Sequence, residues 1–152
     1  MKQETLVVIL EARDFSRERF TEVILSDSIK KISTNTFLDC SSLENITLPD
    51  KLEEIGIGAF SGCSSLKKIN IPNSVTKIGA LAFAGCENLT DVILPNALER
   101  IGNNLFWGCK SLESIKIPDG IKEIGKNAFN FSNLLYMAKK TPMQRNTPKK
   151  II

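Results

Sequence analysis

The chain has 152 residues, of which 42% are hydrophobic and 24% are charged, and its formal net charge is +3. This length fits a single domain, and the composition is that of a globular protein that buries a core, which excludes a disordered chain. The charge is too small to indicate nucleic acid or a membrane surface as the partner. No apolar run reaches the roughly 20 residues that a membrane-spanning helix needs.

The first predicted element is a short strand in the apolar stretch 6–10. This stretch follows Glu4 and is not followed by the small-residue cleavage site of a signal peptide. We therefore expect residues 1–19 to form an N-terminal cap. If the chain is the complete gene product, nothing in it directs export and the expected location is cytoplasmic; if a leader has been removed, the location stays open.

An internal repeat with a period of 23 residues begins at Phe20 and continues to Leu134. Five residue types recur at this one spacing, which is the sequence signature of a repeat architecture. The five columns are Phe37, Phe60, Phe83, Phe106 and Phe129; Cys40, Cys63, Cys86 and Cys109; Leu43, Leu66, Leu89, Leu112 and Leu135; Pro49, Pro72, Pro95 and Pro118; and Ile32, Ile55, Ile78, Ile101 and Ile124.

Each repeat begins with a predicted strand, as in the segment 66–71. Apolar and polar residues alternate there, which places Ile69 and Ile71 inside and Lys68 outside. Pro72 has no backbone donor and should end the strand.

The second half of the repeat returns the chain along the opposite side. The segment 75–79 is apolar at its ends, and Gly79 is expected to supply a backbone conformation that other residues resist. The segment 82–86 is too short for a stable α-helix and predicts a single helical or 3₁₀ turn that carries Phe83 into the core.

One such coil cannot bury its apolar side chains alone, so successive coils stack at the spacing of paired strands. The sequence therefore predicts a β-rich solenoid of about five coils over residues 20–134, with a parallel concave sheet. The first and last repeats are degenerate, as end coils are because one of their faces has no neighbour. Residues 135–152 are expected to be a further degenerate repeat and a basic C-terminal tail.

The repeat resembles the BspA-type leucine-rich repeats, whose signature is LxxIxLPxxVxxIGxxAFxGCxx. Residues 56–63, 78–86 and 101–109 match it closely. The resemblance implies a leucine-rich-repeat solenoid of the α/β right-handed superhelix class. It also implies a surface or secreted protein that acts in adhesion or host-protein binding, and it offers no catalytic residues to transfer.

The residue types of the chain argue against catalysis. Histidine is absent, which removes the commonest general base and metal ligand, and no phosphate-binding loop, dinucleotide motif or nucleophile elbow is present. The cysteines lie 23 residues apart, whereas zinc ligands come in close pairs, so we expect a buried column of thiols. We predict no enzymatic activity, no cofactor and no metal.

Charged residues follow the same period and mostly alternate in sign. The main column is Lys31, Glu54, Lys77, Arg100 and Glu123, and Lys30–Glu53 and Glu99–Lys122 follow the same rule. We expect a solvated ladder of ion pairs between coils, each worth at most about 1 kcal/mol.

Two outward columns on the predicted concave sheet are the leading candidates for partner binding. They are Glu22, Asn45, Lys68, Asp91 and Ser114, and Ile24, Thr47, Asn70, Ile93 and Lys116. Ile93 is apolar where its neighbours are polar, although a single exposed apolar residue is also ordinary on a protein surface.

Trp107 is the alternative hot spot. Its column otherwise holds Leu38, Ser61, Ala84 and Asn130, so the fold does not require a large ring there. Exposed Trp is enriched at binding hot spots, but the ring could also simply cover the neighbouring coil.

The tail after Leu135 contains five basic residues and no acidic one, namely Lys139, Lys140, Arg145, Lys149 and Lys150. Either it is a loosely attached end or it contacts an anionic surface, in which case binding would weaken steeply with salt.

The leading hypothesis is a protein-binding module that uses the concave sheet, with a protein partner that the sequence does not identify. The alternative is a structural repeat fragment of a larger surface protein that stacks end to end through its degenerate ends. The chain is accordingly expected to be a monomer or to self-associate weakly.

Overall fold

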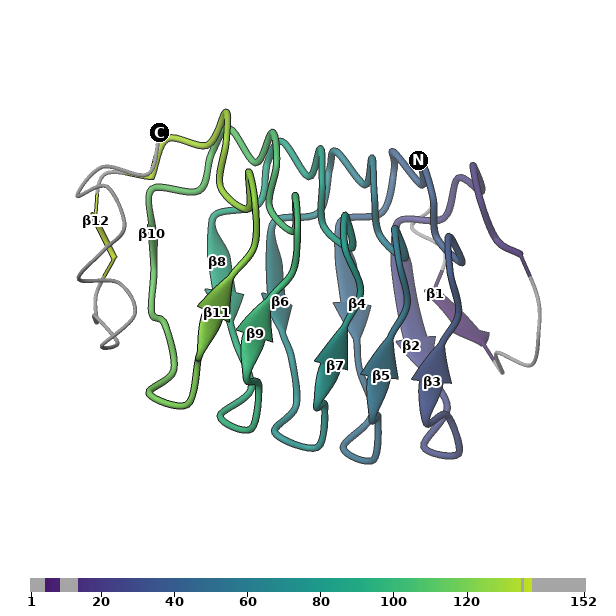
Figure 1. The fold of residues 1–152 in the computed structure, drawn as a ribbon. Coiled ribbons are helices and arrows are strands. Elements are labelled where there is room, and N and C mark those ends of the chain that lie inside the picture. The colour runs from purple at the N-terminus through teal and green to yellow at the C-terminus, as the bar shows by residue number, and fades with distance from the viewer. Residues whose placement is uncertain (1–4, 9–13, 135, 138–152) are drawn as a thin grey trace.

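The computed structural model describes residues 5–8, 14–134 and 136–137. The chain forms a row of stacked coils with one row of strands in front and another behind, as Figure 1 shows. The predicted solenoid of parallel strands is confirmed.

Two rows of short strands form the two sides of the solenoid (Figure 1). The back sheet consists of β1 (Thr5–Val8), β2 (Glu22–Leu25), β4 (Asn45–Thr47), β6 (Lys68–Asn70), β8 (Asp91–Ile93), β10 (Ser114–Ile115) and β12 (Tyr136–Met137). The front sheet consists of β3 (Lys31–Ile32), β5 (Glu54–Ile55), β7 (Lys77–Ile78), β9 (Arg100–Ile101) and β11 (Glu123–Ile124).

Strand pairing follows the repeat register. Glu54 pairs with Lys77 and Ile55 with Ile78, so equivalent positions of successive coils lie side by side. The ladders are interrupted: in the back sheet β4 is not paired with β6, nor β8 with β10, and in the front sheet β7 is not paired with β9.

A stack of phenylalanine rings runs through the core. The rings of Phe37, Phe60, Phe83, Phe106 and Phe129 are all fully buried. Neighbouring centroids lie 5.3 to 5.7 Å apart with nearly parallel ring planes. The column of identical side chains therefore gives every coil the same contact with the next one, which is how a solenoid buries its core.

The predicted helical or 3₁₀ turn is a hydrogen-bonded turn instead, and the described residues contain no helix. The N–H groups of Ala82, Ala84 and Cys86 close turns within their own coil. Those of Leu81, Phe83 and Gly85 donate to the next coil, for example Phe83 to Leu105 O at 3.1 Å. Because alternate donors bond outside the coil, no continuous 3₁₀ ladder forms.

The ring stack extends one coil further towards the N-terminus than the 23-residue columns indicate. Phe15 lies 22 residues before Phe37, is 4% exposed and stacks on it at 5.8 Å. Strand β1 pairs in parallel with β2, which agrees with the strand expected near residues 6–10. The one-residue change in spacing hides Phe15 from a search for a fixed period.

The described part of the chain has no helix with the length and apolarity needed to cross a membrane.

Candidate functional site

The structure brings the two predicted outward columns together on the back sheet. Lys68 is the register partner of Asp91, and Asn70 is that of Ile93. Of the eight candidate residues, Asn45 of β4 is partly buried. The other seven are exposed, namely Thr47, Lys68, Asn70, Asp91, Ile93, Ser114 and Lys116. Between them the inward side chains Ile69 and Ile115 are buried, so the alternation predicted for these strands is confirmed.

Ile93 is the apolar exception in this polar surface, and it is 61% exposed to solvent. It follows the partly buried Val92 and precedes the buried Leu94. Those two residues contribute to the core, whereas Ile93 adds nothing to it. Full burial of an isoleucine against a partner would stabilise a complex by about 1.5–3 kcal/mol.

Trp107 lies at the turn edge of its coil and is 42% exposed. Its ring makes an edge-to-face contact with Phe131, with centroids 5.4 Å apart. These two aromatic residues line a hollow of about 360 Å³ together with Gly85, Gly108 and the side chains of Glu87 and Lys110. The turn edge thus presents an aromatic pair rather than an isolated ring.

Phe131 is a candidate that the sequence reasoning missed. It is 66% exposed and has a φ of +59°, a left-handed conformation that is unusual for a bulky residue. The equivalent positions hold Asp39 and three glycines. The signal available in the sequence was a Phe at a position where the repeat carries Gly.

The charged column forms the predicted ladder only in part. Lys31 lies 3.2 Å from Glu54, and Arg100 lies 3.2 Å from Glu123. The two side pairs are also present: Lys30 lies 3.7 Å from Glu53, and Lys122 lies 2.9 Å from Glu99.

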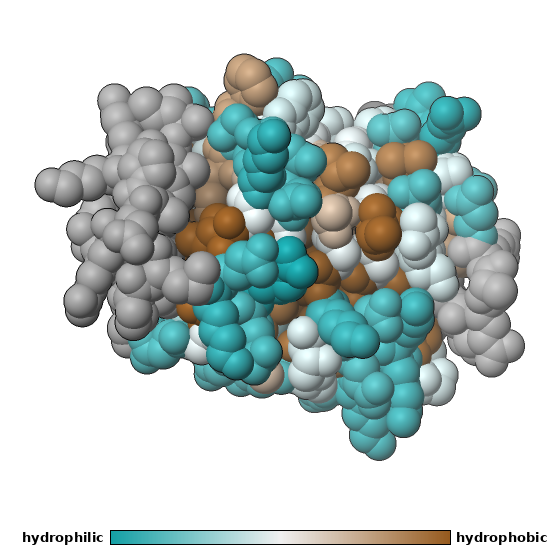
Figure 2. Space-filling model, in the orientation of Figure 1, coloured by the Kyte–Doolittle hydropathy of each residue, from teal (hydrophilic) through white to brown (hydrophobic). Residues whose placement is uncertain are grey.

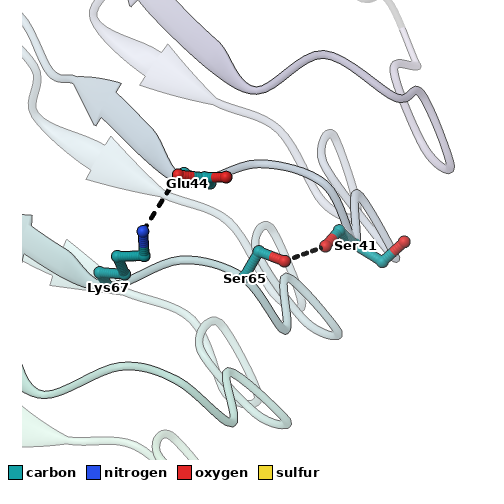
Figure 3. Close-up of polar contacts among 4 residues, drawn as sticks. All are labelled: Ser41, Glu44, Ser65 and Lys67. Atoms are coloured by element: carbon teal, nitrogen blue, oxygen red, sulfur yellow. Dashed lines mark hydrogen bonds and ion pairs between the residues drawn. The ribbon is translucent and has the colours of Figure 1, made fainter. Parts of the chain in front are cut away.

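Two further ion pairs were not predicted, namely Lys67–Glu44 at 3.1 Å beside the back sheet and Lys110–Glu87 at 2.9 Å at the turn edge. Figure 3 shows the first of them, next to a hydrogen bond of 2.6 Å from Ser65 Oγ to Ser41 O. Both pairs join opposite charges that are 23 residues apart, which was the signal available in the sequence. All these charges are solvated, so each pair contributes at most about 1 kcal/mol.

The four cysteines form the buried column of thiols that their spacing predicts. Each thiol donates to the carbonyl of a phenylalanine on the preceding coil, as in Cys86 Sγ to Phe60 O at 3.3 Å and Cys109 Sγ to Phe83 O at 3.1 Å. Loss of hydration raises the pKa of Cys40 to about 11 and that of Cys109 to about 12. Burial also raises the pKa of Cys63 and Cys86, so these thiols stay protonated near neutral pH and lack the thiolate that reactivity requires.

The five basic residues of the tail lie outside the described residues, so the two interpretations of the tail stay predictions. The groups of His, Cys, Asp and Glu that the structure describes include none that could hold a metal ion.

Comparison with known proteins identifies the repeat. The family model of the BspA type leucine rich repeat region matches residues 9–135 in six copies. Comparison with curated protein sequences gives no significant match.

Solved structures with the same fold come from several bacteria. A leucine-rich repeat protein of T. pallidum is 29% identical with a TM-score of 0.73, over 88% of this chain and 63% of that one. A leucine-rich repeat protein of Bacteroides ovatus is 31% identical with a TM-score of 0.60, over 87% and 47%. A leucine rich cell surface protein of Faecalibacterium prausnitzii is 27% identical with a TM-score of 0.61, over 81% and 40%. The chain thus spans less than two thirds of the length of each of these proteins.

Proposed function

Because the chain belongs to the BspA-type leucine-rich repeat family, we propose that it is a non-enzymatic protein-binding module whose back sheet contacts the partner. The observation that carries this proposal is Ile93, which is 61% exposed in the middle of a polar strand surface. Its register partner Asn70 and the nearby Asp91 supply polar groups beside it. An apolar centre surrounded by polar groups matches the usual anatomy of a protein interface.

The scaffold supports this role because the outward side chains can vary without affecting the core. The buried columns of Phe, Leu, Ile and Cys hold the coils, and the outward positions of the back sheet make no contribution to those columns. Such a rigid surface binds at a low cost in conformational entropy, which favours affinity.

A location at the cell surface and a role in adhesion or host-protein binding form part of this proposal. The support is family membership together with the solved relative described as a leucine rich cell surface protein.

The test is affinity capture from the native source with the intact chain and with the double variant Asp91→Ala, Ile93→Ser. The double variant should lose the captured partner by at least about tenfold while its thermal unfolding midpoint stays within about 2 °C of the parent, since both side chains are exposed. The matched control is Asp50→Ala, Lys51→Ala in an exposed turn, which should capture as well as the parent. Equal capture by all three proteins would place the site elsewhere.

The second candidate function is a structural one, as a repeat segment of a larger surface protein that stacks end to end. The observation that favours it is that the chain spans only 40% to 63% of the length of its solved relatives. Sedimentation across a concentration series tests it: association that grows with concentration supports stacking, and a strict monomer contradicts it.

A further inference from the structure

The front sheet is open at one boundary between coils. Strand β7 is not paired with β9, although β5 pairs with β7 and β9 with β11, and Figure 1 shows the wider spacing. The glycine that follows each front strand donates to the preceding coil in three cases: Gly56 to Ile32 O, Gly79 to Ile55 O and Gly125 to Ile101 O, at 2.6 to 2.8 Å. Among the described residues, the equivalent bond from Gly102 to Ile78 O is missing.

The opening exposes a groove of about 670 Å³ over β5, β7 and β9. Ile57, which is 52% exposed, and the exposed Ala97 present apolar surface in its lining, which also includes the buried residues Ile55, Ile78 and Leu98. Figure 2 shows apolar surface in the middle of this face, with hydrophilic residues around it. A groove of this volume falls in the range of natural ligand sites.

The charged residues that line the groove favour an acidic ligand. In the main charged column, which runs along the front strands, Lys31 pairs with Glu54 and Arg100 pairs with Glu123. Lys77 and Arg100, however, are like charges on the two sides of the opening. The acidic residues that line the groove are already paired, Glu54 with Lys31 and Glu99 with Lys122. In the described part of the chain, Lys77 takes part in no ion pair.

Two observations therefore coincide at the same boundary. Among the described front strands, the one unpaired boundary is the one at which the charge alternation fails, with Lys77 and Arg100 at equivalent positions. A carboxylate placed between Lys77 and Arg100 would restore the alternation, and apolar atoms attached to it would cover the exposed apolar lining at Ile57 and Ala97.

We propose that the groove between β7 and β9 binds an extended segment of a partner protein in which acidic and apolar residues alternate. An acidic side chain of that segment pairs with Lys77 and Arg100, and the adjoining apolar side chain packs on Ile57 and Ala97. The lining comes from several successive coils, so a segment of several residues fits it better than a single small acid. This site lies on the sheet opposite to the columns of Asp91 and Ile93, so it is separate from the proposed function.

The probe is a synthetic peptide, acetyl-(Glu-Ile)₃-amide with a fluorescent label, titrated with the intact chain and followed by fluorescence anisotropy. Saturable binding is expected, and it should weaken as salt is added because exposed charges are screened. A peptide with Gln in place of Glu should bind at least about tenfold more weakly, since hydrogen bonds to a charged group are about twice as strong as neutral ones. No binding up to about 1 mM, or equal binding of the Gln peptide, would overturn the proposal.

Two substitutions locate the peptide in the groove. Lys77→Glu should weaken binding at least about tenfold, because it replaces a cation of the groove with an acid, whereas Lys51→Glu makes the same change of net charge in an exposed turn and should alter binding less than about twofold. Ala97→Trp should block the groove sterically, and Asn88→Trp adds the same ring at an exposed position outside it. Circular dichroism melting of each variant shows that it is folded. Binding that survives both Lys77→Glu and Ala97→Trp in folded protein would overturn the proposal.

Discussion

Two boundaries between coils, β5/β7 and β7/β9, are built from the same repeat but differ in structure. At the first boundary, a Cβ added to Gly79 would meet Ile57 N at 2.4 Å, so the coils approach as closely as glycine allows. At the second, a Cβ on Gly102 would have its nearest neighbours in Ala80 at 3.5 Å, which is ordinary contact. A conserved position in the repeat therefore does not by itself fix how tightly two coils close.

The back sheet shows the opposite difference, since β4 and β6 are unpaired at the first boundary whereas β6 pairs with β8 at the second. At the open boundary, Phe83 N still donates to Leu105 O, Gly85 N donates to Trp107 O, and the rings of Phe83 and Phe106 stay stacked at 5.7 Å. The turn edge and the ring stack thus hold both boundaries, and each of the two boundaries lacks strand pairing on one side only.

The largest expected effect comes from removing a ring that serves both boundaries. Phe83 stacks on Phe60 at 5.4 Å and on Phe106 at 5.7 Å and is fully buried. Phe83→Ala should lower the free energy of unfolding by about 3–5 kcal/mol, through lost burial and the cavity left behind. Equilibrium unfolding in urea measures the change. A loss below about 1 kcal/mol would show that the rings do not hold the coils together.

A matched pair of substitutions compares the two boundaries directly. Gly79→Ala should cost about 1–3 kcal/mol, because the added methyl collides with the backbone of Ile57. Gly102→Ala should be neutral or should stabilise by up to about 1 kcal/mol, because the methyl fits and the unfolded chain loses freedom. Thermal and urea unfolding of both variants gives the change in the free energy of unfolding for each. Equal losses of stability in the two variants would contradict the open geometry at Gly102.

The thiol column crosses both boundaries and predicts an alkaline loss of stability. Burial raises the pKa of Cys109 to about 12, against an unfolded value of 9.0. The folded chain therefore keeps this proton in the window between those two values, where the unfolded chain releases it, and stability falls as the pH rises. Each such thiol removes about 1 kcal/mol of unfolding free energy between pH 9 and pH 10.

Urea titrations at pH 8, 9 and 10 measure this dependence. Cys109→Ala, which lacks one of the four thiols, should show a shallower fall in stability over that range than the parent does. The same pH dependence in parent and variant would mean that Cys109 is not protected in the folded state.

The smallest effect concerns the turn above the open boundary. Leu81 is exposed and has a φ of +62°, whereas the equivalent positions hold Asn35, Gly58, Asn104 and Asn127. Leu81→Asn should stabilise the chain by about 0.5–1 kcal/mol, since Asn tolerates this left-handed conformation better. Leu81→Ala is the control, because it removes the same apolar surface and keeps the unfavourable conformation. The melting temperature should rise for Asn relative to Ala.

The candidate back-sheet site was predictable in position because side chains alternate along a strand and the period sets the register. Lys68 with Asp91 and Asn70 with Ile93 are neighbours for that reason. Phe131 was not predictable as an exposed aromatic partner of Trp107, because its repeat lost the Gly-Cys that marks the turn. Phe15 was missed because it lies 22 residues before Phe37, one residue fewer than the period of the repeat.

The sequence by itself determined the solenoid. The 23-residue columns of Phe, Cys, Leu, Pro and Ile dictate which side chains are buried, which face outward and which lie next to each other in successive coils. Only the tertiary structure decided that every second N–H group of the turn donates to the next coil, which excludes a 3₁₀ helix. It also decided that β7 and β9 are not paired. Those outcomes depend on small differences between competing backbone bonds and neighbouring charges, which a repeat pattern does not encode because each coil has the same pattern but different neighbours.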